Sequence, residues 1–183
     1  MNETERLLRA ATFAAEKHRD QKRKDADASP YINHPLAVAA LLAGDGGVTD
    51  IELLAAALLH DTVEDTETSR DEITRLFGSD ISGLVAEVTD DKSLPKARRK
   101  QLQVENGPHK SDRAKQLKLA DKTCNIRDID ADSPANWDAD RKAQYLSWAV
   151  RVIDGCRGVN QPLEQLFDQA IMEARQRLNA AQQ

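Results

Sequence analysis

The sequence predicts an all-α protein that forms a single domain over residues 1–183. Of its 183 residues, 40% are hydrophobic and only 4% are aromatic, while Ala, Leu and charged residues dominate. This composition is typical of helices, because strands favour β-branched and aromatic residues. A chain of this length buries roughly 70% of its unfolded surface, which suits one compact core. No linker, internal repeat or low-complexity segment divides it.

Apolar residues that recur at helical spacing predict nine helices in order along the chain. They cover about 4–17, 36–43, 51–59, 73–77, 81–88, 96 to a stop at 106–108, 114–126, 137–153, and a last segment after Pro162. Pro35 suits the first turn of the second helix, and Gly44 ends that helix. Two capping boxes are predicted before the third and fourth helices, namely Thr49 with Glu52 and Ser69 with Glu72.

The helix at 51–59 is apolar nearly all round, so we expect it to cross the core. It leads into Leu58–Leu59–His60–Asp61–Thr62–Val63–Glu64–Asp65, which adds a histidine and three carboxylates. Glu64 lies four residues after His60, so the two share a helix face, and Asp65 is related in the same way to Asp61. Acids buried together need a cation or a proton. A divalent metal meets that need, although for an isolated His-Asp pair the preferred interpretation would be a helix end that frays into an acidic loop.

Two further residues make a metal site the preferred interpretation. His34 stands at a helix entrance, and Asp121 interrupts an apolar helix face. Taken singly, His34 would be a capping or surface histidine, and Asp121 an exposed partner of a nearby Lys or Arg. Together with His60 and Asp61 they make a set of two histidines and two aspartates. Such a set favours Mn²⁺, Fe²⁺ or Mg²⁺ over structural Zn²⁺, and leaves about two octahedral positions for water and substrate.

Charge and cysteine content narrow the class of protein further. The net charge of -5 disfavours general binding of nucleic acid. Residues 92–118 hold nine Lys/Arg against two Asp/Glu, a local charge of +7, which suits a small polyanion or, alternatively, one solvated helix face. The chain starts without an apolar signal segment and contains no membrane-length apolar run, so we expect a cytoplasmic protein. Cys124 and Cys156 lack the spacing of a disulfide framework or a thiolate zinc site.

Several stretches of the chain resemble the hydrolase domain of the RelA/SpoT alarmone enzymes, which belongs to the HD superfamily of metallophosphohydrolases. The small stand-alone hydrolases are the most similar form. The matching stretches are 29–35 (Ser-Pro-Tyr-Ile-Asn-His-Pro), 57–66, 88–92, and 118–122 with Asn125. The resemblance extends over about residues 10–161. Nothing in the sequence resembles the synthetase domain of the long family members, so we expect degradation of the alarmone without synthesis.

The resemblance implies an HD-type helical fold and a manganese-dependent reaction. That reaction removes the 3′-pyrophosphate of guanosine tetra- or pentaphosphate and yields GDP or GTP with pyrophosphate. It implies four metal ligands: His34, His60, Asp61 and Asp121. Glu64 and Asp65 resemble the pair that orients and deprotonates the attacking water.

The same resemblance implies a set of substrate-binding residues: Arg23, Lys24, Tyr31, Lys96, Asn125, Arg141 and Tyr145. Arg23, Lys24 and Tyr31 would face the nucleotide, although plain solvation is the competing role of the two cations. Asn125 would contact the ribose. Arg141 and Tyr145 would reach phosphate or base, and either Lys96 or Arg98 would hold the diphosphate.

Two other functions remain compatible with these residues. The first is a different nucleotide phosphohydrolase on the same metal site, for instance one that removes the 2′-phosphate of NADPH. The second is a nucleotide-binding regulatory module that keeps a metal for stability. In each case the expected partner is a small molecule, with neither nucleic acid nor membrane. The sequence makes no prediction of oligomeric state.

Overall fold

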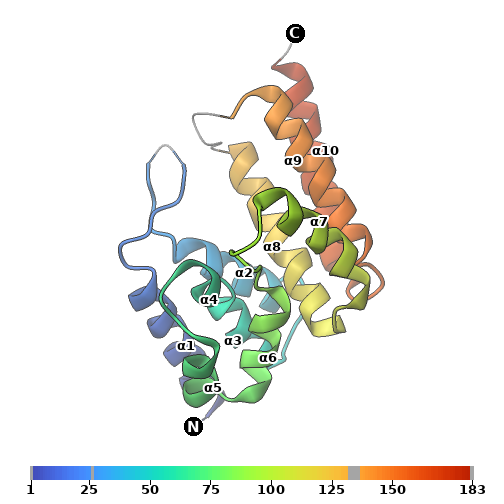
Figure 1. Cartoon of the computed structure of the whole chain (residues 1–183). Helices are drawn as coiled ribbons and strands as arrows, with labels where there is room; N and C mark the ends of the chain where they lie inside the picture. Colours follow the sequence, from blue (N-terminus) through green and yellow to red (C-terminus); the bar gives the residue numbers. More distant parts are fainter. Residues whose placement is uncertain (1, 26, 132–136, 182–183) are drawn as a thin grey trace.

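The structure is a computed structural model that describes residues 2–25, 27–131 and 137–181. Within these ranges the chain forms ten α-helices and one 3-10 helix and contains no β-strand, which confirms the all-α prediction (Figure 1). The α-helices are α1 (Glu3–Lys17), α2 (Asn33–Ala43), α3 (Ile51–Leu59), α4 (Thr62–Asp65), α5 (Arg70–Phe77), α6 (Ser79–Val88), α7 (Lys96–Asn106), α8 (Asp112–Ala131), α9 (Ala139–Asp154) and α10 (Gln161–Ala180). The 3-10 helix, η1, spans Gly107–His109.

Helix α3 is the centre of the fold. Every residue from Leu53 to Leu59 is buried, and the helix contacts α1, α2, α6 and α8. Burial of so many alanines and leucines drives folding through the hydrophobic effect and explains why no polar face was visible in the sequence. Because α3 ends inside the molecule, His60 directly after it also lies in the interior.

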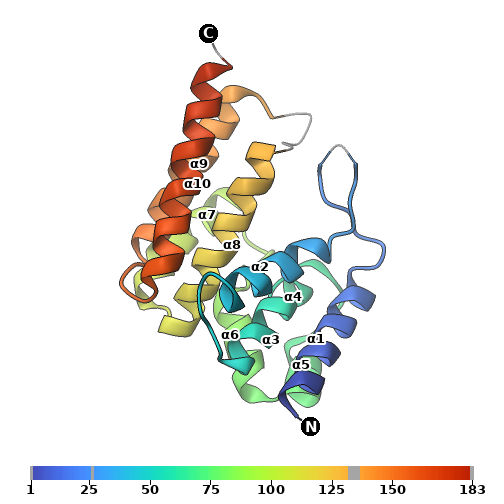
Figure 2. The same cartoon turned by 180° about the vertical axis from the view of Figure 1, so that it is seen from behind.

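Helix α8 joins the two halves of the molecule. It packs against α9 and α10 on one side and against α2, α3 and α6 on the other. Figures 1 and 2 show α9 and α10 running along one side of α8, with α1 to α6 gathered on the opposite side. Three of its buried residues are charged, namely Lys118, Asp121 and Lys122. Charged groups inside a core need partners, so α8 marks the place where the core becomes a polar site.

The N-terminus of α3 differs from the predicted capping box. Asp50, not Thr49, is the N-cap, and its carboxylate accepts a hydrogen bond of 3.1 Å from the Leu53 N–H. Glu52 reaches across to α1 and forms an ion pair of 2.5 Å with Arg6. The capping box of Thr49 with Glu52 was therefore wrong, because the adjacent carboxylate is an equally good cap and Glu52 has a partner on another helix.

Other helix ends follow the sequence more closely. Ser69 caps α5 by accepting the N–H of Glu72, and Pro35 lies in the first turn of α2 as predicted. Helix α9 begins at Ala139 after the cap Asp138, two residues later than predicted. The short helix α4 was not predicted as a separate element, since the residues after His60 form a turn before the chain becomes helical again.

Cys124 and Cys156 are both buried in the core and form no disulfide. Among the described helices, none combines the length and apolar character that a membrane span requires.

Candidate active site

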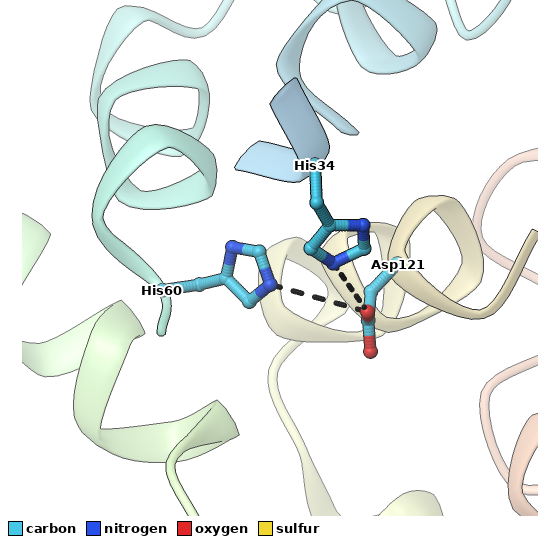
Figure 3. A group of neighbouring side chains, drawn as sticks. All are labelled: His34, His60 and Asp121. Atoms are coloured by element: carbon cyan, nitrogen blue, oxygen red, sulfur yellow. Dashed lines mark ion pairs between the residues drawn. The ribbon is translucent and has the colours of Figure 1, made fainter. Parts of the chain in front are cut away.

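Three side chains from different parts of the chain meet inside the protein (Figure 3). His34 comes from the start of α2, His60 follows α3, and Asp121 lies in the middle of α8. The Nε2 atoms of His34 and His60 lie 3.3 and 3.9 Å from Asp121 Oδ1, and one ligand atom from each residue falls within 4.8 Å of the others. All three residues are buried, at 3–5% exposure.

Local structure fixes the orientation of these side chains. The Nδ1 of His60 lies 2.7 Å from the carbonyl oxygen of Ala57, and because a carbonyl only accepts, Nδ1 carries the proton. In the neutral form that a metal ligand requires, the lone pair of His60 is then on Nε2, which faces Asp121 (Figure 3). On the other side, Lys122 Nζ holds Asp121 Oδ2 at 2.9 Å, and the amide of Asn125 donates to Oδ1.

Asp61, the fourth predicted ligand, lies beside the same group. Its Oδ2 is 3.2 Å from His60 Nε2 and 3.8 Å from His34 Nε2, and it accepts a hydrogen bond of 2.7 Å from the Tyr31 hydroxyl. Burial lowers the pKa of His60, but the charges of Asp61 and Asp121 outweigh it and raise that pKa to about 9. Burial raises the pKa of the Asp61 carboxyl, but His60 and His34 outweigh it and hold that pKa below its usual range.

The donor set fits a divalent cation. The buried atom His60 Nε2 makes no hydrogen bond, although buried polar atoms normally have a partner. Two imidazoles beside two carboxylates are the nitrogen and oxygen ligands that Mn²⁺, Fe²⁺ and related ions accept. The orphaned Nε2 of His60, aimed at a carboxylate, is the arrangement a metal ligand needs.

Glu64 and Asp65 lie on α4, next to this cluster. Glu64 Oε2 accepts the Asp90 N–H at 3.0 Å, and its Oε1 is 3.5 Å from a guanidinium nitrogen of Arg99. Asp65 forms an ion pair with Lys92. Burial raises the pKa of Glu64, the Asp90 N–H opposes that rise, and neighbouring carboxylates reinforce it. A raised carboxyl pKa makes the carboxylate a stronger base, which is the property the sequence assigned to this pair.

Two adjoining cavities open beside the cluster. The first, of about 690 Å³, is lined by residues that include Tyr31, His34 and Asp65. The second, of about 450 Å³, is rich in cations: Lys96, Arg99, Lys100, Lys122 and Arg141. Asn125, Trp137 and Tyr145 line both cavities, which therefore form one continuous site.

All seven predicted substrate-binding residues line this pair of cavities. Arg23, Lys24 and Tyr31 line the first, Lys96 and Arg141 line the second, and Asn125 and Tyr145 line both. Arg98, the alternative to Lys96, does not line either cavity and pairs with Glu105 at 3.1 Å on the exposed side of α7. The geometry brings the predicted residues together, while their roles stay predictions.

Sequence reasoning missed eight residues of the second cavity: Asp90, Arg99, Lys100, Gln103, Lys122, Trp137, Gln144 and Trp148. Two of them carried a signal. Lys122 directly follows the candidate ligand Asp121, and Trp137 stands four residues before Arg141, whose guanidinium lies 4.8 Å from its ring. For Arg99 and Lys100 the run of basic residues was visible, but not which of them face inward.

Comparison with known proteins identifies the family of this chain. The model of the HD domain family matches residues 10–149. The guanosine-3′,5′-bis(diphosphate) 3′-pyrophosphohydrolase MESH1 of Homo sapiens is 53% identical over 164 residues, which are 90% of this chain and 92% of that protein. The protein of the same name from Xenopus tropicalis is 53% identical over 167 residues, 91% and 93% of the two chains.

A solved structure gives the same result. It is described as a metazoan ortholog of SpoT that hydrolyzes ppGpp, and it superposes with a TM-score of 0.89 at 47% identity, covering 94% of this chain and 95% of that one. The resemblance drawn from the motifs is confirmed. The chain belongs to the HD domain family, among the small alarmone hydrolases of RelA/SpoT type.

Proposed function

We propose that this protein hydrolyses the 3′-diphosphate of guanosine tetra- or pentaphosphate and releases GDP or GTP together with pyrophosphate. One observation carries the proposal: the His34, His60 and Asp121 cluster lies beside a site in which a nucleoside-sized cavity continues into a strongly basic one. The relatives named above act on that nucleotide according to their names. A diphosphate ester of a nucleoside matches both halves of the site.

Mn²⁺ is the metal we propose, held by His34, His60, Asp61 and Asp121. A donor set of nitrogen and oxygen atoms without thiolates suits Mn²⁺. When bound, it supplies Lewis-acid polarisation of the phosphoryl oxygens and of the attacking water.

Glu64 acts as general base in this proposal. It takes a proton from the attacking water while the water oxygen bonds to the phosphorus that carries the ribose 3′-oxygen. The bond between that phosphorus and the 3′-oxygen then breaks, and the proton passes to the 3′-oxygen as pyrophosphate leaves. Asp65, held by Lys92, orients the water. The raised pKa of Glu64 supports its role, because a base is most effective when its pKa approaches the working pH.

The two cavities divide the substrate between them. Tyr31, with the Arg23 guanidinium 5.6 Å from its ring centre, offers a stacking surface for guanine. Asn125, which lines both cavities, contacts the ribose, and Tyr145 lies beside it. Lys96 and Arg141 hold the diphosphate. Cations fixed in this way neutralise the charge that spreads over the phosphoryl oxygens in the transition state.

We further propose that residues 1–183 act as one domain in the cytoplasm on a small-molecule substrate, with no nucleic acid or membrane partner. The net charge of -5 supports the exclusion of nucleic acid, because domains that bind nucleic acid typically carry an excess of basic residues.

The direct test is incubation of chelator-stripped protein with guanosine tetraphosphate, with and without Mn²⁺, followed by anion-exchange chromatography. GDP and pyrophosphate that appear only with metal are the expected products. Release of inorganic phosphate would reject this reaction, and parallel assay of NADPH would then test the alternative phosphatase. Absence of turnover with both nucleotides would favour a regulatory binding module.

A further inference from the structure

Arg99 connects the carboxylate of Glu64 with the basic cavity. A guanidinium nitrogen of Arg99 lies 3.5 Å from Glu64 Oε1, and the same side chain lines the second cavity. The side chain is only 23% exposed, and its Nε atom is buried without a hydrogen-bond partner. A buried N–H that faces no acceptor is unusual, so this donor indicates a partner that the protein itself does not supply.

Glu64 has two contacts, one with a main-chain N–H and one with a side chain. Its Oε2 accepts a main-chain N–H, that of Asp90, while Oε1 faces the long side chain of Arg99. The neighbouring Gln103 donates to Asp90 Oδ2 at 2.6 Å, and its own Oε1 is buried without a partner. The main-chain bond fixes the position of Glu64. The contact with Arg99 is longer, at 3.5 Å, and the Nε donor of that arginine has no hydrogen-bond partner.

The surroundings of Arg99 favour an anion. Lys96, Lys100, Lys122 and Arg141 line the same cavity. Burial lowers the pKa of Lys100, and the charges of Lys96, Lys122 and Arg141 lower it further. The lining holds five cations against one carboxylate, that of Asp90, so the cations repel one another until a further anion is present. A phosphate carries more charge than one carboxylate and accepts two guanidinium bonds at once.

We propose that Arg99 changes partner when the diphosphate of the substrate enters the basic cavity, leaving Glu64 for a phosphate oxygen, so that the base is released when its substrate is in place. The inference rests on the proposed function in taking Glu64 as the base. A carboxylate paired with an arginine is a weaker base than an unpaired one. The exchange therefore couples binding to reactivity, and limits activation of water in the absence of substrate.

A cycle of variants measures this exchange without any turnover. The full chain is titrated calorimetrically with inorganic pyrophosphate, with and without Mn²⁺, as wild type, Glu64→Gln, Arg99→Gln and the double variant. In the Glu64→Gln background the Arg99 guanidinium has no competing carboxylate, so Arg99→Gln should weaken pyrophosphate binding about tenfold there. In the wild type Glu64 competes for the same guanidinium, so Arg99→Gln should weaken pyrophosphate binding less than about threefold. Equal losses of pyrophosphate affinity in the two backgrounds would make Arg99 an independent anion ligand and overturn the proposal. An unchanged affinity in both backgrounds would also overturn it.

Arg98→Gln is the matched control, since it removes a neighbouring arginine of α7 that pairs with Glu105 on the exposed side. Binding of pyrophosphate to this variant should equal that of wild type. A loss as large as that of Arg99→Gln would show a general effect of helix charge and reject the specific exchange.

Steady-state kinetics give a second readout. Arg99→Gln in the otherwise wild-type protein should raise KM by less than about threefold, as for pyrophosphate binding, and change kcat less. Arg99→Lys should recover part of the loss because it restores the charge without the fork of donors. A fall in kcat with unchanged KM would instead indicate a merely structural role. If the wild type fails to hydrolyse guanosine tetraphosphate but the pyrophosphate cycle behaves as expected, the proposed substrate is wrong and the exchange at Arg99 stands.

Discussion

Replacement of Asp121 by Ala tests the metal cluster and the core of α8 at the same time. The carboxylate faces the two histidines through Oδ1, while its Oδ2 lies 2.9 Å from Lys122 Nζ and 4.0 Å from Lys118 Nζ. Both lysines are nearly buried, at 6% and 5% exposure. Asp121→Ala therefore removes a candidate metal ligand and leaves two buried ammonium groups without their counter-charge.

The size of the effect follows from the burial of these charges. Breaking a buried ion pair by removing one partner costs about 3–5 kcal/mol, against a total stability of about 5–15 kcal/mol for a domain. We expect Asp121→Ala to keep a helical spectrum in native buffer, to lose this amount of unfolding free energy, and to lose metal binding. Urea unfolding in the presence of chelator, followed by circular dichroism, measures the free energy of unfolding. Calorimetric titration with Mn²⁺ measures metal binding.

A double variant separates the two roles. Asp121→Ala with Lys122→Met replaces the uncompensated lysine by an apolar side chain of similar length, so it should recover most of the lost stability while metal binding stays absent. Two results would refute the reasoning. One is a single variant that unfolds within about 0.5 kcal/mol of the wild type, as an ordinary surface substitution does. The other is a double variant no more stable than the single one.

Three further predictions concern the neighbouring groups. Glu64→Gln should lower kcat by about 10²- to 10⁴-fold and leave substrate affinity largely intact; single-turnover assays would show this, and near-normal turnover would exclude Glu64 as the base. Because the pKa of His60 is raised from 6.5 to about 9, its protonation stabilises metal-free protein below about pH 6.5, and that contribution is lost as the pH rises through 9. Metal binding should strengthen over the same range, because the metal displaces this proton, so unfolding curves with and without Mn²⁺ should diverge toward high pH. Tyr31→Phe removes the hydroxyl that donates to Asp61 at 2.7 Å, and Mn²⁺ affinity measured by titration should fall about tenfold, with His109→Ala as a distant control.

The candidate metal ligands were visible in the sequence because of the chemistry of their residue types. A run of alanines and leucines that ends in His60 and Asp61 indicates a buried polar site in any helical fold. Asp121 was visible for the same reason, as a carboxylate on an apolar face. The distances between these residues came only with the packing of α2 and α8 against α3, since no local pattern says which helices meet.

The second cavity was less predictable, as α7 illustrates. None of its residues is buried, so apolar periodicity does not define its inward face. Arg98 and Arg99 are adjacent in the sequence, yet one pairs with Glu105 at the surface and the other faces Glu64. The direction of each arginine depends on how α7 packs against α9, which is a tertiary property. Thr49 and Asp50 show the same limit at a helix end, where two suitable caps stand side by side.

The balance of charge in the site explains why a metal and a phosphate belong together there. Asp121 is matched by Lys122 and Lys118, Glu64 by Arg99, and Asp65 by Lys92. With Asp61 ionised and both histidines neutral, as they must be to bind a metal, these carboxylates and cations cancel one another. A divalent ion then adds positive charge that the protein does not compensate, beside a cavity that already holds Lys96, Lys100 and Arg141. Only a strongly anionic ligand restores neutrality, so binding of metal and of diphosphate should each strengthen the other by the same factor.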